Sequence, residues 1–181
     1  MIGRSAPALL VMGVAGSGKS TFGAALAAAM GAHFLDADDL HPDANRRKMA
    51  AGIPLEDSDR MPWLDAVAAW ITARQAGGGI CVVACSALRR NYRDRLRAAA
   101  HRVRFVYLRV PEAELRRRME HRKHFMPPIL LRSQLDTLEI PEAEADVLTV
   151  DGTGPLAGNV SRTMAWLDVG KPSDAPSAHP M

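Results

Sequence analysis

A glycine-rich segment near the start of the chain carries the strongest chemical signal in the sequence. It reads GVAGSGKS over residues 13–20 and matches the pattern G-x-x-x-x-G-K-[ST] between an apolar run and a helix-like segment. Such a loop turns its backbone N–H groups around phosphate oxygens, its lysine reaches the β- and γ-phosphates, and its serine hydroxyl binds Mg²⁺. We therefore expect a nucleotide-phosphate site built from Gly13, Gly16, Ser17, Gly18, Lys19, Ser20 and Thr21.

Two carboxylates follow the next apolar run. In an extended chain, Asp36 and Asp38 would point to the same side, at the edge of the sheet where ligands bind in parallel α/β folds. Phosphoryl transfer to an alcohol needs one carboxylate to hold hydrated Mg²⁺ and another to orient or deprotonate the hydroxyl group. This pair could supply both, whereas Asp39 is better interpreted as a helix cap. No N-K-x-D element is present, which disfavours a guanine-binding switch protein.

Polar residues farther along could form the site for the molecule that accepts the phosphoryl group. On one helix, His41, Asn45 and Lys48 would share a face, and a cation beside two hydrogen-bonding groups fits a polyhydroxylated anion. Ser86 and Arg89 follow the third apolar run and could complete this pocket. The alternative interpretation is a helix cap and a surface arginine.

The densest basic stretch, RRRMEHRKH over residues 116–124, has three interpretations. Arg118 and Arg122 lie one helical turn apart and could project together over a triphosphate. A solvated basic face and a nucleic-acid contact are the alternatives, and the second is disfavoured because Phe125 is the one aromatic residue beside the run. The arginines at positions 90, 93, 95 and 97 are predicted to form the solvated face of another helix.

Short apolar runs alternate with helix-like segments along the chain, which predicts an α/β fold: a parallel sheet of about five strands with helices on both faces. The length of 181 residues favours one domain, over residues 1–168, followed by a Pro- and Ser-rich tail at 169–181 that we expect to be disordered. The expected strands are 8–12, 33–35, 80–85, 103–108 and 147–150, and the expected helices are 21–30, 42–51, 61–75, 91–100, 112–122, 129–138 and 156–167.

Composition narrows the class of protein. A formal net charge of +3 is too small to argue for nucleic-acid binding, and no apolar run reaches the roughly 20 residues of a membrane span. Cys81 and Cys85 lie within one apolar run, where a mutual disulfide would be geometrically awkward. Two buried thiols fit a reducing compartment, so we expect a cytoplasmic protein.

The motifs together resemble those of the gluconokinase family, small P-loop kinases that phosphorylate D-gluconate on its 6-hydroxyl. The resemblance covers residues 13–139 and is carried by GVAGSGKS, FLDADDLHP, NRRKMAAGIPLEDSDRMPWL, CSALRRNYRDRLR and HFMPPILLRSQLDTLE. It implies an adenylate-kinase-like three-layer fold with a mobile lid at about residues 118–131, the use of ATP and Mg²⁺, and a homodimer. Kinases for another sugar acid or a shikimate-like acid, or a nucleotide-binding module without turnover, are the alternatives.

The resemblance also implies individual roles. Asp38 would contact the reacting hydroxyl, Asp36 would hold Mg²⁺ through water, and Lys48 and Arg60 would hold the carboxylate of the acceptor. The predicted catalytic residues are Lys19, Asp38 and Arg122. Two departures from the family pattern are the alanine at position 15 of the loop and the segment PEAEA after position 140. We expect the adenine contacts near the loop 151–155.

Overall fold

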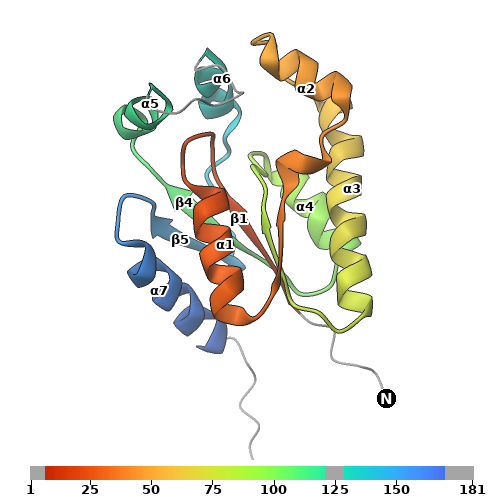
Figure 1. The fold of residues 1–181 in the computed structure, drawn as a ribbon, viewed down its shortest axis with the longest axis vertical. Coiled ribbons are helices and arrows are strands. Elements are labelled where there is room, and N and C mark those ends of the chain that lie inside the picture. The colour runs from red at the N-terminus through yellow and green to blue at the C-terminus, as the bar shows by residue number, and fades with distance from the viewer. Residues whose placement is uncertain (1–6, 121–128, 170–181) are drawn as a thin grey trace, which may run out of the picture.

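A five-stranded, all-parallel sheet with the order β2-β3-β1-β4-β5 forms the centre of the molecule (Figure 1). The structure is a computed structural model that describes residues 7–120 and 129–169. All five residues of the central strand β1 are fully buried, as expected for a strand covered on both faces. The strands are β1 (Ala8–Met12), β2 (His33–Asp36), β3 (Cys81–Ala84), β4 (Val103–Arg109) and β5 (Val147–Asp151).

Two helical layers cover the sheet, one on each face. Helices α3 and α4 pack on one face and α1 and α7 on the other, and this arrangement confirms the predicted α/β architecture. In the described part of the chain the helices are α1 (Lys19–Met30), α2 (Asp43–Ala50), α3 (Asp57–Ala76), α4 (Arg90–Ala99), α5 (Glu112–Glu120), α6 (Ile129–Thr137) and α7 (Leu156–Val169), with a 3₁₀ turn, η1 (Ala37–Leu40).

Strand β1 supplies side chains alternately to the two cores. Leu10 and Met12 pack with Trp63 and Ile71 of α3, whereas Leu9 and its neighbours on the same side pack with α1 and α7. A smaller third cluster lies beyond the carboxyl ends of the strands, where α5 and α6 pack against the glycine-rich loop. The two large cores hold the sheet rigid, so the loops at its carboxyl edge are positioned by a fixed framework.

The strand order places the candidate site. The chain runs from β1 to β2 and β3 on one side and then crosses to β4 on the other, so the connections diverge beside β1. Parallel α/β sheets bind their ligands at such a point, beyond the carboxyl ends of the strands. The segments that leave β1, β2 and β3 at this edge are the glycine-rich loop, η1 and the residues from Cys85 onward. Helices α2, α5 and α6 lie around the same end of the molecule (Figure 1).

One helix begins earlier than the sequence predicted. Helix α3 starts at Asp57 instead of Met61, because the Glu56 side chain accepts from the helix backbone while the Asp59 carboxylate accepts from Glu56 N at 2.9 Å. Pro62 therefore lies inside the helix, not at its start, and its missing N–H removes one backbone hydrogen bond. The other elements agree with the predicted ranges to within two residues where the chain is described.

The cysteines, the expected lid and tail, and the length of the helices are the remaining features predicted from sequence. Both cysteines are free and buried, as predicted. Residues 121–128 and 170–181 lie outside the described residues, and with them lie Arg122, most of the expected lid and the expected tail, which remain predictions. Within the described ranges, no helix has the length and apolar character that a membrane crossing requires.

Candidate functional site

The glycine-rich loop has the backbone geometry of an anion site. Gly18, with a φ of 94°, directly precedes α1, so the unpaired N–H groups at the start of the helix face the loop. Gly16 has a φ of 80°, and a Cβ there would lie 3.2 Å from Met119 Cγ, so close packing and backbone conformation both favour glycine. Lys19 extends over the loop and donates from Nζ to Val14 O at 3.1 Å.

A buried hydroxyl group in the loop, which makes no hydrogen bond to the described residues, indicates whether phosphate fits there. Ser17 is 2% exposed, and its Oγ has no hydrogen-bond partner among the described residues. A buried polar atom without a partner is costly unless a ligand supplies one. The orphaned hydroxyl, the helix N-terminus and the lysine therefore fit an anionic phosphate group.

The two carboxylates after β2 are close together but differently placed. Asp36 ends the strand and accepts from Ser20 Oγ at 2.5 Å and from the backbone N of Asp38 at 3.1 Å. The second bond caps η1, so Asp38 lies in a tight turn and not in the extended strand that the sequence predicted. A serine hydroxyl beside a carboxylate is an oxygen pair that fits Mg²⁺, directly or through water.

One cavity joins the loop to the expected acceptor residues. Lys19 and Asp38 both line it, as do Arg60 from α3 and Ser86 after β3. A nucleotide phosphate on the loop and a hydroxyl beside Asp38 would share this space. The full lining is Ala15, Lys19, Asp38, His41, Met49, Pro54, Leu55, Arg60, Trp63, Ser86, Leu88, Leu130, Ser133 and Gln134.

His41 forms part of the cavity wall as a neutral ring. It stacks on Trp63 with ring centroids 4.3 Å apart, and Asn45 Nδ2 donates to its Nδ1 at 3.3 Å. Burial, with smaller contributions from the charges of Arg46 and Arg60, lowers the pKa of His41 to about 4. Because Nδ1 accepts, the proton lies on Nε2, which faces Asp38 Oδ1 at 3.9 Å.

This pKa predicts a pH dependence of stability. The unfolded chain takes up the His41 proton near the ordinary pKa of 6.5, whereas the folded chain does so only near 4. His41 should therefore make the free energy of unfolding fall by up to about 3 kcal/mol as the pH drops from 6.5 to 4. Urea unfolding at several pH values should show a shallower decline in His41→Gln. The exposed His33 gives the control His33→Gln, and equal slopes in wild type and His41→Gln would contradict the assignment.

Three predicted acceptor residues make supporting contacts outside the cavity lining. Lys48 Nζ binds both carboxylate oxygens of Asp59 at 2.7 and 2.8 Å, which together with a backbone contact lowers the pKa of Asp59. Asn45 is buried and also donates to Asp59 O at 2.9 Å. Arg89 binds Asp57 at 3.2 Å. His41 precedes α2 instead of lying on it, so the expected shared helical face of His41, Asn45 and Lys48 does not form.

A polar chain beneath the cavity orients Arg60. Its guanidinium donates to the hydroxyl oxygen of Tyr92 at 3.1 Å and lies over the same ring, 5.6 Å from the centroid. Tyr92 in turn donates to Asp57, and Arg89 binds the same carboxylate. Burial and the bond to Asp57 raise the pKa of Tyr92, so it stays a donor at neutral pH.

Arg118 lies against the opposite side of the loop. It donates to Gly152 O at 2.9 Å, and its Nη1 lies 3.5 and 3.4 Å from the carbonyl oxygens of Gly16 and Ser17. A second cavity opens here beside the loop 151–155, where the sequence placed the adenine contacts. Its lining is Ser17, Gly18, Thr21, Phe22, Leu108, Arg118, Gly152, Gly154, Leu156 and Asn159.

Helix α6 contributes residues that sequence reasoning missed. Leu130, Ser133 and Gln134 line the first cavity, and Ala15 N donates to Gln134 Oε1 at 2.7 Å. Their signal was present in the signature HFMPPILLRSQLDTLE, which contains all three. Among the described residues, no cluster of three or more His, Cys, Asp or Glu side chains could hold a metal ion.

Comparison with known proteins agrees with this site. A family model described as an AAA domain matches residues 9–140. The gluconokinase of Gluconobacter oxydans (strain 621H) is 45% identical over 80% of this chain and 82% of its own length, and the thermoresistant gluconokinase of Escherichia coli (strain K12) is 42% identical over 90% and 94%. This chain belongs to the gluconokinase family.

A solved structure of another family member has the same fold. The gluconokinase from Sinorhizobium meliloti 1021 superposes with a TM-score of 0.80, is 48% identical, and is aligned over 92% of this chain and 94% of its own. The family model that matches residues 9–140 spans the loop, the two carboxylates and the cavity lining. The family resemblance and the α/β kinase fold predicted from sequence are thereby confirmed.

Proposed function

We propose that this chain transfers the γ-phosphoryl group of ATP to the 6-hydroxyl of D-gluconate. As a member of the gluconokinase family it is a phosphotransferase. The observation that carries the proposal is the single cavity lined by both Lys19 of the phosphate loop and Asp38 of the acceptor side. In that arrangement the phosphoryl donor and the hydroxyl group can lie next to each other in one cavity, shielded from bulk water.

The nucleotide side consists of the loop and its neighbours. The loop backbone and the start of α1 bind the phosphates, while the Lys19 ammonium neutralises charge on the transferring group. The Ser17 hydroxyl gains the partner that it lacks among the described residues. Ser20 and Asp36 would hold Mg²⁺, which would neutralise phosphate charge when bound. Arg118 and the second cavity would receive the rest of the nucleotide.

The acceptor side consists of charged and hydrogen-bonding groups around Asp38. The carboxylate of Asp38 orients the hydroxyl group and accepts its proton as transfer proceeds. Arg60, held by Tyr92, binds the carboxylate of gluconate through its paired N–H groups. Ser86 and the Nε2–H of neutral His41 can contact the hydroxyls of the sugar chain.

A measurement of acceptor preference tests the function. ATP consumption is followed with gluconate, other aldonic acids, shikimate and nucleoside monophosphates, with and without Mg²⁺. We expect Mg²⁺-dependent turnover that is fastest with gluconate. Faster turnover with shikimate or a nucleoside monophosphate would overturn the proposed acceptor, and the absence of turnover with every acceptor would favour a nucleotide-binding module.

Arg60 offers a test of the acceptor assignment. Arg60→Lys should raise KM for gluconate about tenfold, because one ammonium cannot reproduce the bidentate fork and the bond to Tyr92 together. KM for ATP should change little. Steady-state kinetics with each substrate varied in turn gives both KM values. Arg47 on α2 is exposed, so Arg47→Lys is the matched control. A larger change in KM for ATP than in KM for gluconate would assign Arg60 to nucleotide binding.

Assembly, location and extent are also proposed. The homodimer comes from the family resemblance, the single domain from the chain length, and the location from the two buried thiols. We infer that residues 1–168 form one kinase domain, that the protein is a homodimer, and that it acts in the cytoplasm on a small-molecule acceptor without nucleic-acid or membrane partners. Light scattering coupled to size-exclusion chromatography measures the oligomeric state, and a monomeric mass at assay concentration would contradict the dimer.

A further inference from the structure

Among the described residues, the most deeply buried charge outside the site lies on helix α4. Arg93 is 1% exposed, and its partner Glu144 is 6% exposed. The sequence predicted Arg93 on a solvated helical face together with three other arginines, and for Arg93 that prediction is wrong. A charge this buried is retained only where its partners satisfy it, so its contacts show what it holds in place.

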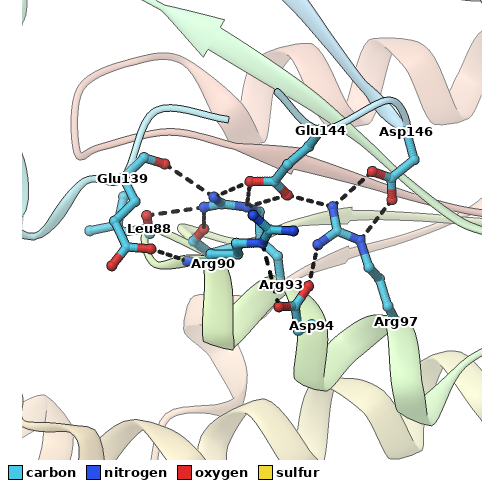
Figure 2. A network of polar contacts seen from close by, with 9 residues as sticks. Leu88, Arg90, Arg93, Asp94, Arg97, Glu139, Glu144 and Asp146 are labelled. Atoms are coloured by element: carbon cyan, nitrogen blue, oxygen red, sulfur yellow. Dashed lines mark hydrogen bonds and ion pairs between the residues drawn. The ribbon is translucent and has the colours of Figure 1, made fainter. Parts of the chain in front are cut away.

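All five N–H groups of this guanidinium are used (Figure 2). Nη1 donates to Ala87 O at 2.9 Å and to Leu88 O at 3.1 Å. Nη2 donates to Glu139 O at 3.1 Å and to the Glu144 carboxylate, which also accepts from Nε at 3.0 Å. Burial alone would raise the pKa of Glu144, but the bonds from Arg93 and Arg97 outweigh it and lower that pKa, so the carboxylate stays ionised.

These partners come from two segments, and each contains or directly follows residues that line the acceptor cavity. Ser86 and Leu88 line the cavity, and Ala87 between them has a φ of 43°, a left-handed conformation that alanine rarely adopts. Such a conformation persists only when its surroundings hold it. Arg93 binds the carbonyl oxygens of both residues that follow Ser86.

The second segment that Arg93 binds directly follows α6. Leu130, Ser133 and Gln134 of α6 line the cavity, and the chain then passes through Glu139 to Glu144. Backbone contacts join the two segments at the same place, because Glu139 N donates to Leu88 O at 2.9 Å and the Glu139 carboxylate accepts from Arg90 N at 2.6 Å. Figure 2 shows the Arg93 guanidinium between Leu88, Glu139 and Glu144, with the Glu139 carboxylate bonded to Arg90.

We propose that Arg93 is a positioning residue that fixes the Ser86–Leu88 turn and the 139–144 segment relative to each other, and thereby sets the affinity for the acceptor acid. Arg93 is outside the cavity lining and acts through Ser86, Leu88 and α6. This inference rests on the proposed function, since it assigns the cavity to the acceptor. The phosphate loop meets both segments, through Gly13 N to Ser86 O at 3.4 Å and Ala15 N to Gln134 Oε1 at 2.7 Å. Lys19 and Arg118 are held by other contacts, so we expect the larger effect on the acceptor.

The test compares two variants on one helix. Arg93→Lys keeps the positive charge but offers three donors instead of five, and should raise KM for gluconate about tenfold while KM for ATP stays within about twofold. Arg95→Lys is the matched control, because Arg95 makes an exposed ion pair with Asp65 at 2.7 Å. It should leave both constants unchanged. Assays are run well below the melting temperature of each variant, which is measured in parallel.

A double-mutant cycle separates positioning from stability. If Arg93 acts through the Ser86 turn, Ser86→Ala should raise KM for gluconate by a smaller factor in the Arg93→Lys background than in wild type. A lower melting temperature with unchanged KM for gluconate would overturn the proposal and leave Arg93 a stabilising residue. If Arg93→Lys does not fold, Glu144→Gln is used in its place, because it leaves the bonds from Arg93 to Ala87 and Leu88 intact. Glu144→Gln should raise KM for gluconate by a smaller factor than Arg93→Lys. An unchanged KM for gluconate in Glu144→Gln would overturn the proposal.

The identity of the acceptor and the positioning role of Arg93 can be overturned independently of each other. Wild-type preference for another acid overturns gluconate as the acceptor, and the ratio of KM values is then measured for that acid. An acceptor-specific increase in Arg93→Lys still supports positioning in that case. Equal increases for acceptor and ATP would overturn it, because they would show a general distortion of the site.

Discussion

Replacing Lys19 with alanine is expected to lower kcat by about 10³-fold or more while the fold is retained. The side chain leaves the loop toward the cavity that it shares with Asp38, so its ammonium lies where charge develops on the transferring phosphoryl group. Steady-state ATP consumption with gluconate gives kcat, and thermal melting checks the fold. The bond from Lys19 Nζ to Val14 O is lost in this variant, and a single bond of this kind contributes about 1 kcal/mol to stability.

A second substitution at the same position separates charge from packing. Lys19→Met keeps a long stem over the loop and removes the charge, so it should lose as much activity as Lys19→Ala. Near-normal turnover in Lys19→Met would show that the ammonium does not act on the phosphoryl group. Loss of the melting transition in both variants would instead show that Lys19 is needed for folding.

The phosphate loop could be predicted from sequence because its chemistry is local. The fixed glycines, Lys19 and Ser20 lie within eight consecutive residues, and the strand and helix around them have clear apolar patterns. Asp36 and Asp38 were located for the same reason. Their relative geometry was not, because the Asp36 side chain caps a turn that removes Asp38 from the strand.

Contacts between residues that are far apart in the sequence could not be predicted from the spacing of residues along the chain. Lys48 has a favourable spacing from His41, yet its ammonium binds Asp59, which lies on another helix. Arg93 meets Glu144, a residue 51 positions away. The available signal for Arg93 was its helical spacing, because it lies three residues before Leu96 and shares the buried side of α4. A periodic pattern marks which side of a helix is buried, but it does not identify the partner across the interface.

The family motifs recovered part of this long-range information. HFMPPILLRSQLDTLE marked α6 as part of the kinase before any fold was known, although it did not indicate that Gln134 would bind the loop at Ala15. The departures from the family pattern at position 15 and after position 140 fall beside these contacts. Ala15 still donates its backbone N–H, and Glu144 supplies the buried carboxylate in the second segment.

Asp38→Asn is expected to lower kcat by about 10²- to 10⁴-fold with a much smaller change in ATP affinity. Asparagine keeps the shape of the side chain in the turn but cannot accept a proton from the reacting hydroxyl. Asp38 lines the cavity together with Lys19 and Arg60, whereas Asp36 is the carboxylate that binds Ser20 of the phosphate loop. The loss should therefore fall on the chemical step. Single-turnover rates and the binding of a non-hydrolysable ATP analogue measure the two effects separately.

The neighbouring Asp39 provides the matched control. It lies in the same turn but is exposed and outside the cavity lining, so Asp39→Asn should leave kcat within about twofold of wild type. Equal losses in ATP-analogue binding and in turnover for Asp38→Asn would assign Asp38 to the metal ion and not to the hydroxyl. A strong loss confined to the chemical step, together with an unaffected Asp39→Asn, would place the base at Asp38, because a single atom exchanged at the cavity wall would then account for the whole effect.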